Sequence, residues 1–217
     1  MLYNNIQIDW LGHSSVKIKT KDKIIYIDPY NILNEKEKAD YILITHNHHD
    51  HCSLADISRL VKQETIAIIS ADCQSTINKL NMPIHTRILE PKNSVSLEGL
   101  RVLAIPAYNT NKPNHPKDEY WNGYVLDVES VKIYHSGDTD LIPEMNSLSG
   151  KIDIALLCVG GKFTMNSDEA SEAAFVIKPK IAIPIHYGSV IGTDRDALNF
   201  VQLCKKNNID GRILEKR

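Results

Sequence analysis

Residues 41–51 read Tyr-Ile-Leu-Ile-Thr-His-Asn-His-His-Asp-His. The first five positions, residues 41–45, form a continuous apolar run, which is typical of a strand buried on both faces. Polar residues begin directly after this run, so a rigid strand end would present them to a cleft, which is where functional residues collect. We therefore start from this stretch and ask which other parts of the chain would meet it.

The patterned positions of this stretch are His46, His48, Asp50 and His51. Neutral imidazole is a common ligand of borderline divalent metals, and carboxylate oxygen completes such sites. Alternate residues of an extended loop point the same way, so His46 and His48 would converge on one metal. Asp50 and His51 would lie beyond a bend in this loop and would face a second metal. The alternative is a solvated loop that happens to hold histidines, but chance would produce this pattern in on the order of one in a thousand such chains.

Two other predicted strands end in residues of the same kind. Asp138 follows the apolar run 131–135, and Gly137 before it permits a sharp turn. His186 directly follows the apolar run 181–185. Taken singly, each could be a turn aspartate or a packed histidine. Their common place at strand ends predicts that both residues share one cleft with the histidine-rich stretch.

These residues resemble the metallo-β-lactamase superfamily, and the match covers nearly the whole chain. It includes five further segments, at 10–15, 28–29, 137–140, 163–165 and 184–188. The details resemble the branch that contains ascorbate-6-phosphate lactonase and many proteins known only as metal-dependent hydrolases. The resemblance implies an α/β fold, namely an αββα sandwich of two mixed sheets with helices on the outer faces, as a single domain over residues 1–217.

The resemblance also implies a ligand set for two metals. His46 and His48 would hold the first, and Asp138 would bridge the two. The second would be held by Asp50, His51 and His186. A hydroxide between the metals would be the nucleophile.

The chain departs from the family pattern at one position. The family supplies a third histidine to the first site from a strand end near the middle of the chain, and Asn109 stands there. Three alternatives follow: Asn109 ligates weakly through its carbonyl, His115 folds back to serve, or the first site is partly open. His115 lies in a polar loop and could instead be an exposed histidine.

Four residues are candidates for proton transfer. Asp50 or Asp138 could accept the proton of the attacking water, and His13 or His115 could assist the leaving group. The resemblance puts His13 near the mouth of the cleft. A hydrogen-bonded structural histidine is an equal alternative at that position.

The sequence therefore predicts a metal-dependent hydrolase that uses a metal-activated hydroxide on a small phosphodiester, lactone or ester. Two divalent metal ions are expected, zinc first, with manganese, iron or nickel as alternatives, because the ligands are nitrogen and oxygen. The alternative is a metal-binding or sensing protein that keeps the fold without activity, and the missing histidine at Asn109 supports it.

Composition narrows the class of partner. The chain has 217 residues, 42% of them hydrophobic and 24% charged, with a net charge of −2. The chain has no excess of basic residues, so a large nucleic acid is not expected as a partner. No segment is apolar over the ~20 residues that a membrane span needs. A small-molecule substrate is expected, and a homo-oligomer is left open. Four cysteines without close spacing predict free thiols and, together with the lack of a signal peptide, a cytoplasmic protein.

Periodicity predicts short strands, first in meanders and then alternating with helices, which indicates α/β or α+β. Strands are expected at 6–10, 15–18, 23–27, 41–45, 65–70, 101–105, 123–128, 131–135, 153–158 and 181–185. Helices are expected at 54–61, 73–80, 167–177 and 194–205. Ser53 is the expected N-cap of the first helix, and Asn166 or Ser167 that of the third.

Overall fold

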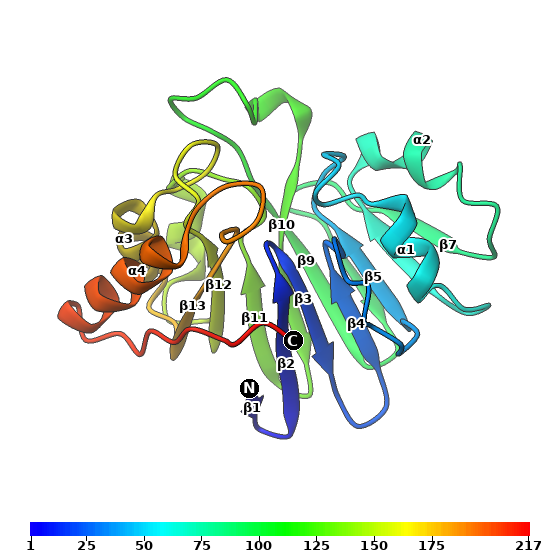
Figure 1. Cartoon of the computed structure of the whole chain (residues 1–217), viewed down its shortest axis with the longest axis horizontal. Coiled ribbons are helices and arrows are strands. Elements are labelled where there is room, and N and C mark those ends of the chain that lie inside the picture. Colours follow the sequence, from blue (N-terminus) through cyan, green and yellow to red (C-terminus); the bar gives the residue numbers. More distant parts are fainter.

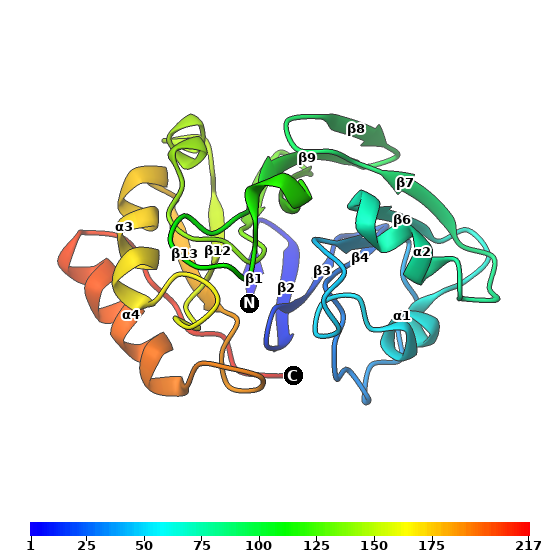
Figure 2. The same ribbon diagram turned by 90° about the horizontal axis from the view of Figure 1, so that it is seen from above.

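Two β-sheets pack face to face in the computed structural model, which describes residues 1–217, and helices lie outside both sheets (Figures 1 and 2). The N-terminal sheet contains, in order, β1 (Leu2–Tyr3), β2 (Ile6–Gly12), β3 (Ser15–Lys19), β4 (Ile24–Ile27), β5 (Tyr41–Ile44), β6 (Ile66–Ile69) and β7 (His85–Ile88). The C-terminal sheet contains, in order, β8 (Ser94–Leu97), β9 (Leu100–Pro106), β10 (Asn122–Val128), β11 (Val131–His135), β12 (Ile154–Cys158) and β13 (Ile181–Ile185). The predicted sandwich of two mixed sheets is therefore confirmed.

Strand direction explains why the polar loops meet. Strands β1 to β4 pair antiparallel and β4 to β7 parallel, so β2, β4, β5 and β6 all run the same way. In the other sheet, β11, β12 and β13 are parallel. The backbone N–H of Asn122 donates to the carbonyl of Thr45 at 3.2 Å, which joins the two sheets at the end of β5. The carboxyl ends of the site-bearing strands consequently share one edge, the upper edge in Figure 1.

Strand β5 is buried on both faces, as its apolar run predicts. Tyr41 and Leu43 point into the core between the sheets. Ile42 and Ile44 pack instead in the smaller core under helix α1 (Leu54–Leu60). Full burial of one such side chain contributes about 1.5–3 kcal/mol. The strand is thereby fixed from two sides, and the loop that follows it begins from a rigid point.

Three predicted helices are present with their predicted starts. Ser53 caps α1 by accepting from the backbone N–H of Asp56. Asn166 caps α3 (Ser167–Ile177), where Glu169 completes a capping box that satisfies free backbone donors. Helix α4 (Asp194–Lys206) packs beside α3 on the outside of the C-terminal sheet (Figures 1 and 2).

The predicted helix at 73–80 is wrong in length. The chain forms a 3-10 turn at Ala71–Cys73 and one turn of helix, α2 (Gln74–Ile77). The segment holds Ser75, Thr76 and Asn78, which favour helices weakly, and nothing caps its start. Strands β1, β7 and β8 lie at or near sheet edges, and their short runs gave no clear strand pattern.

The two ends of the chain meet at the carboxylate of Asp9. Arg217 Nη1 lies 3.0 Å from Asp9 Oδ2, and the amino group of Met1 lies 3.8 Å from Asp9 Oδ1. Lys216 forms a parallel bridge with Trp10, so the C-terminal residues run beside β2. The last residues thus hold the two sheets together across their open side.

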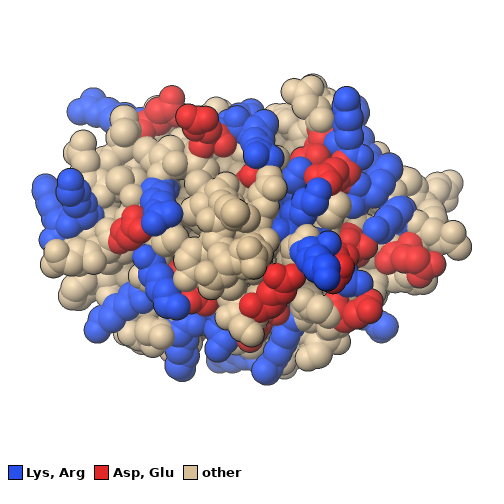
Figure 3. Space-filling model, turned by 90° about the horizontal axis from the view of Figure 1, so that it is seen from below, with Lys and Arg blue, Asp and Glu red and all other residues tan.

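Charges of both signs are interspersed on the face seen from below, around a tan centre (Figure 3). No field of one sign covers that face, as the small net charge of −2 predicts. All four cysteines are buried and free, which confirms the prediction of thiols. None of the helices combines the length and apolarity that a bilayer crossing needs.

Candidate metal centre

Eight of the nine predicted site residues lie together at the shared edge of the two sheets. Their ligand atoms form three overlapping groups, each with all atoms within 4.8 Å of one another. The groups are His46, His48 and His115; His46, His51 and Asp138; and His13, Asp50, His51 and His186. The ninth, Asn109, contacts the cluster through His115, whose backbone N–H donates to Asn109 Oδ1 at 2.9 Å. Five separate loops, which follow β2, β5, β9, β11 and β13, supply these residues.

Asp138 lies at the centre of this cluster. Its Oδ2 lies 3.0 Å from His186 Nε2, 3.3 Å from His115 Nε2 and 3.4 Å from His51 Nε2. Gly137 makes this position reachable, because its φ of +59° is left-handed and a Cβ there would collide with the carbonyl oxygen of Asn122. The predicted sharp turn before Asp138 is thus present.

Several ligand atoms of the cluster make no hydrogen bond within the protein. Nε2 of His51, His115 and His186 and Oδ1 of Asp138 are fully buried without a hydrogen bond. Buried polar atoms are normally paired, and each unpaired one costs about 1–3 kcal/mol. Imidazole nitrogens and a carboxylate oxygen that converge in this way are the donor set that zinc and similar divalent metals prefer. The residues therefore fit a bound metal.

The ring of His51 is oriented by a buried carboxylate. Its Nδ1 lies 2.8 Å from Oδ2 of Asp28, which also accepts from the hydroxyl of Thr45 at 2.7 Å. The other oxygen of Asp28 accepts from the backbone N–H of Thr45 at 2.8 Å. Because Nδ1 donates to Asp28, Nε2 of His51 is left to face Asp138. Orientation of ligand histidines by a second carboxylate is common in metal sites.

The pKa shifts differ between the two parts of the cluster. Burial holds the pKa of His46 well below its ordinary value, and burial together with the other histidines lowers that of His48. Burial alone would raise the pKa of Asp138, but His186 and His51 hold it well below its usual range. Burial alone would lower the pKa of His51, but the Asp138 carboxylate helps to raise it well above its ordinary value. A metal at His51 must therefore displace a proton, whereas His46 is already neutral at pH 7.

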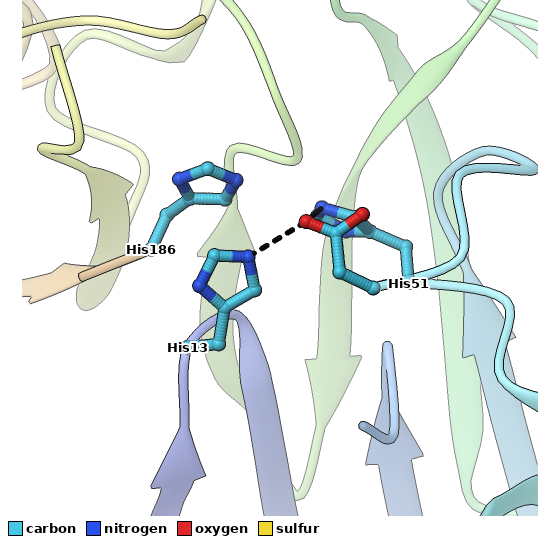
Figure 4. A group of neighbouring side chains, drawn as sticks. His13, His51 and His186 are labelled. Carbon is cyan, nitrogen blue, oxygen red and sulfur yellow. Dashed lines mark hydrogen bonds and ion pairs between the residues drawn. The ribbon is translucent and has the colours of Figure 1, made fainter. Parts of the chain in front are cut away.

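His13 lies inside the cluster, so the predicted place at the mouth of the cleft is corrected. It is 1% exposed, and its Nε2 lies 2.9 Å from Asp50 Oδ2. The carbonyl of His13 accepts from Trp10 Nε1 and from the backbone N–H of His186, both at 2.8 Å. Figure 4 shows His13 and His186 approaching from one side and His51 from the other. The left-handed φ of +51° at His13 turns the ring inward from the end of β2.

The side-chain amide of Asn109 is fully engaged in hydrogen bonds beside the cluster. Its Oδ1 accepts from the backbone N–H of His115 at 2.9 Å. Its Nδ2 donates to Asp140 Oδ1 at 3.0 Å and to the carbonyl of Phe163 at 2.9 Å. With its amide engaged in this way, the geometry favours His115 over Asn109 as the third ligand of the first group. The loop that carries His115 folds back over the site, as one of the three alternatives requires.

Sequence reasoning missed two residues that surround the cluster. Asp140 is 2% exposed and binds the loop of Asn109, and its position two residues after Asp138 was the available signal. Trp121 packs against the rings of His46 and His48, with centroids at 4.8 and 4.9 Å. It is itself buried.

A cavity of about 230 Å³ opens onto the cluster. It is lined by His48, His49, Asp50, Asn114, His115, Phe163 and Val190. Larger hollows, of about 360 and 560 Å³, lie by the outer face of the C-terminal sheet and contain none of the cluster residues. The smaller cavity is therefore the candidate substrate site, because residues of the cluster line it.

Two mixed sheets with outer helices and a histidine–aspartate cluster at one edge define a metallo-β-lactamase-type sandwich. The family model described as Beta-lactamase superfamily domain matches residues 7–186. The chain therefore belongs to the β-lactamase superfamily, as its motifs predict. The narrower resemblance to ascorbate-6-phosphate lactonase stays a prediction.

The relatives of the chain are named as metal-dependent hydrolases or metallo hydrolases. A metal-dependent hydrolase of Thermoplasma acidophilum is 36% identical over 194 residues, which cover 85% of this chain and 84% of the relative. A Parabacteroides distasonis protein, provisionally named a metal-dependent hydrolase, has a crystal structure with a TM-score of 0.86 and 32% identity, covering 98% and 94% of the two chains. Igni18 of Ignicoccus hospitalis shares the fold at a TM-score of 0.80 and 22% identity, covering 97% and 95%.

Proposed function

We propose that this protein hydrolyses a small phosphodiester, lactone or other ester with two divalent cations bound at the cluster. One observation carries the proposal: buried ring nitrogens of His51, His115 and His186, which have no hydrogen bond, surround the carboxylate of Asp138 at 3.0–3.4 Å. The names of the relatives support hydrolysis. Zinc is the first choice of metal, with manganese, iron and nickel as alternatives, because the ligands are nitrogen and oxygen.

The three groups of ligand atoms support an assignment to two sites. His46, His48 and His115 would hold the first cation, and Asp50, His51 and His186 the second. Asp138 would contact both, since it lies between the groups. His13 stands beside Asp50 in the second group and would orient that carboxylate.

Bound cations would supply the Lewis acidity that lowers the pKa of water and polarises the substrate oxygen. The residues of the chain would do the rest. Asp50, partly lining the cavity, is within reach of an entering water and would accept its proton. His13 is hydrogen-bonded to Asp50 and would hold that carboxylate in place while it carries the proton. The burial of Asp138 limits access of bulk water, which strengthens each electrostatic contact around it.

The cavity supports a small substrate. Its volume of about 230 Å³ is below the ~300–1,000 Å³ of sites for drug-sized ligands. Phe163 and Val190 give it an apolar wall, while His49 and Asn114 supply polar groups. A substrate with one short apolar arm beside its ester or phosphate would suit these walls. The alternative of an inactive metal-binding protein depended on the missing histidine at Asn109, and the position of His115 beside His46 and His48 supports the hydrolase instead.

The proposal predicts that an Asp138→Asn variant loses at least one cation and its turnover while it keeps the fold. The measurements are metal content after purification without added metal and hydrolysis of bis(p-nitrophenyl) phosphate and of a lactone panel. Asp127→Asn, on β10 at the outer face of the same sheet, is the control and should change neither. Turnover in Asp138→Asn equal to that of the unchanged protein would refute the two-cation hydrolase.

A further inference from the structure

The loop between β9 and β10 carries His115 and is held by the side-chain amide of Asn109. The orientation of that amide follows from its partners. Nδ2 faces Asp140 Oδ1 and the carbonyl of Phe163, which can only accept, and Oδ1 faces the backbone N–H of His115, which can only donate. Reversing the amide would break all three contacts, so its orientation is determined by the network.

The same network decides which ring nitrogen of His115 carries the proton. His115 Nδ1 lies 3.0 Å from the carbonyl oxygen of Phe163 and 3.1 Å from Oδ1 of Asn109. Both oxygens are acceptors, so Nδ1 must be the donor. In the neutral ring Nε2 then keeps its lone pair. Nε2 is the atom that points to the cluster, 3.3 Å from Asp138 Oδ2.

Asp140 fixes the beginning of this loop. Its Oδ2 accepts from the backbone N–H of Thr110 at 2.8 Å, and its Oδ1 accepts from Asn109 and pairs with Lys112. The backbone N–H of Asp140 also donates to the carbonyl of Tyr108 at 2.9 Å. One buried carboxylate thus joins the loop of His115 to the turn that presents Asp138. A ligand on a long loop needs such support, because small displacements loosen a site.

We propose that Asn109 and Asp140 are positioning residues that hold His115 as its Nδ1–H tautomer and thereby set the cation affinity of the first site. This inference rests on the proposed cation at that site. In the family pattern a histidine at the position of Asn109 binds the metal. In this chain Asn109 would instead orient His115, and His115 would bind the metal. Loss of such supporting groups typically lowers metal affinity about 10- to 100-fold.

The first test measures the tautomer in the metal-free protein with ¹⁵N-labelled histidine, at a pH high enough that the ring of His115 is neutral. The ring nitrogens of His115 should give the Nδ1–H pattern in the unchanged protein and a mixed or Nε2–H pattern in Asn109→Ala. An unchanged His115 pattern in Asn109→Ala overturns the proposal. This measurement needs no bound cation, so it is independent of whether the proposed hydrolase activity exists.

The second test measures occupancy of each site in chelator-buffered zinc, with the ring signal of His115 reporting the first site and that of His186 the second. Asp140→Asn and Asn109→Ala should weaken the first site about 10- to 100-fold. They should change the second site less than twofold. Equal weakening of both sites, which general loosening of the fold would cause, overturns the proposal.

The chain offers a matched control for the carboxylate. Asp153 accepts from the backbone N–H of Lys132 at 2.8 Å and pairs with Lys180 at 2.7 Å, as Asp140 does with Thr110 and Lys112. It lies just before β12 and does not belong to the cluster. Asp153→Asn should leave both zinc affinities and the His115 tautomer unchanged. A loss of zinc affinity in this control equal to that in Asp140→Asn contradicts a positioning role.

Discussion

At the scale of single residues, the sequence predicted those members of the cluster that lie close to one another along the chain. His46 and His48 follow one strand, and local geometry alone brings them together. His115 needed a contact between distant residues, which no spacing reveals, so it remained one of three alternatives. Asp140 was missed because its role is to hold a loop, and a carboxylate near Asp138 reads equally well as a turn residue.

His115→Ala should reduce the cation content from two to one per chain, because the first group would keep only His46 and His48. Metal analysis after dialysis against a weak chelator measures this. His85→Ala, a change to an exposed histidine at the start of β7, is the control and should keep both. Two cations retained in His115→Ala would favour the open-site alternative.

Asp140 should also contribute to stability in a pH-dependent way. Burial alone would raise its pKa, but Lys112 and the backbone N–H of Thr110 outweigh burial and lower it. A carboxyl whose pKa is lower in the folded state stabilises above its unfolded pKa, and that contribution is lost as pH falls through the folded value. The difference in free energy of unfolding between the unchanged protein and Asp140→Asn should therefore be about 1.5–3 kcal/mol at pH 7 and shrink below about pH 4. Urea unfolding at several pH values measures it, and a difference that grows toward low pH would contradict this sign.

At the scale of elements, the buried strands and the capped helices were predicted, because each carries its own signal. Strand β5 is apolar at every position, and α3 begins at a capping box. Edge strands such as β7 and β8 are only four residues long, which leaves too few positions for a clear pattern. The segment 73–80 shows the opposite error, since apolar spacing indicated a full helix while weak helix formers limit it to one turn.

Gly123 in β10 should be essential for the turn that presents Asp138. A Cβ at Gly123 would lie 2.6 Å from the carbonyl oxygen of Ser136 and 2.8 Å from that of His135. Gly123→Ala should therefore lower the free energy of unfolding by about 1–3 kcal/mol and weaken cation binding. Gly150→Ala, which has a left-handed φ but open space, should cost stability without affecting the cations. Thermal unfolding and zinc titration check both, and intact cation binding in Gly123→Ala would contradict the prediction.

At the scale of the molecule, periodicity alone leads only to α/β or α+β, because the facing of two sheets depends on contacts between distant strands. The sandwich came from the resemblance of the motifs. The cluster draws on both sheets: His46 to His51 follow the N-terminal sheet, and Asp138 and His186 follow the C-terminal sheet. The single domain and the cytoplasmic location stay predictions, and the oligomeric state is left open.

Chelation should lower the thermal stability of the whole chain, since a cation that binds only the folded state stabilises it by mass action. At a free concentration of 100 times Kd the effect of one cation is about 2.7 kcal/mol. Scanning calorimetry with and without a strong chelator measures the change in melting temperature. Asp138→Asn should respond less to the chelator. An equal melting temperature with and without chelator in the unchanged protein would contradict cation binding.

The meeting of Met1 and Arg217 at Asp9 makes the chain nearly a closed ring. A short linker could join the two ends, and new ends could be opened in an exposed turn such as the one between β7 and β8. In such a circular permutant His186 would precede His13 along the chain, with their spatial positions unchanged. The order of the ligands in the sequence would then differ from that of the unpermuted chain, although the cluster itself would be the same.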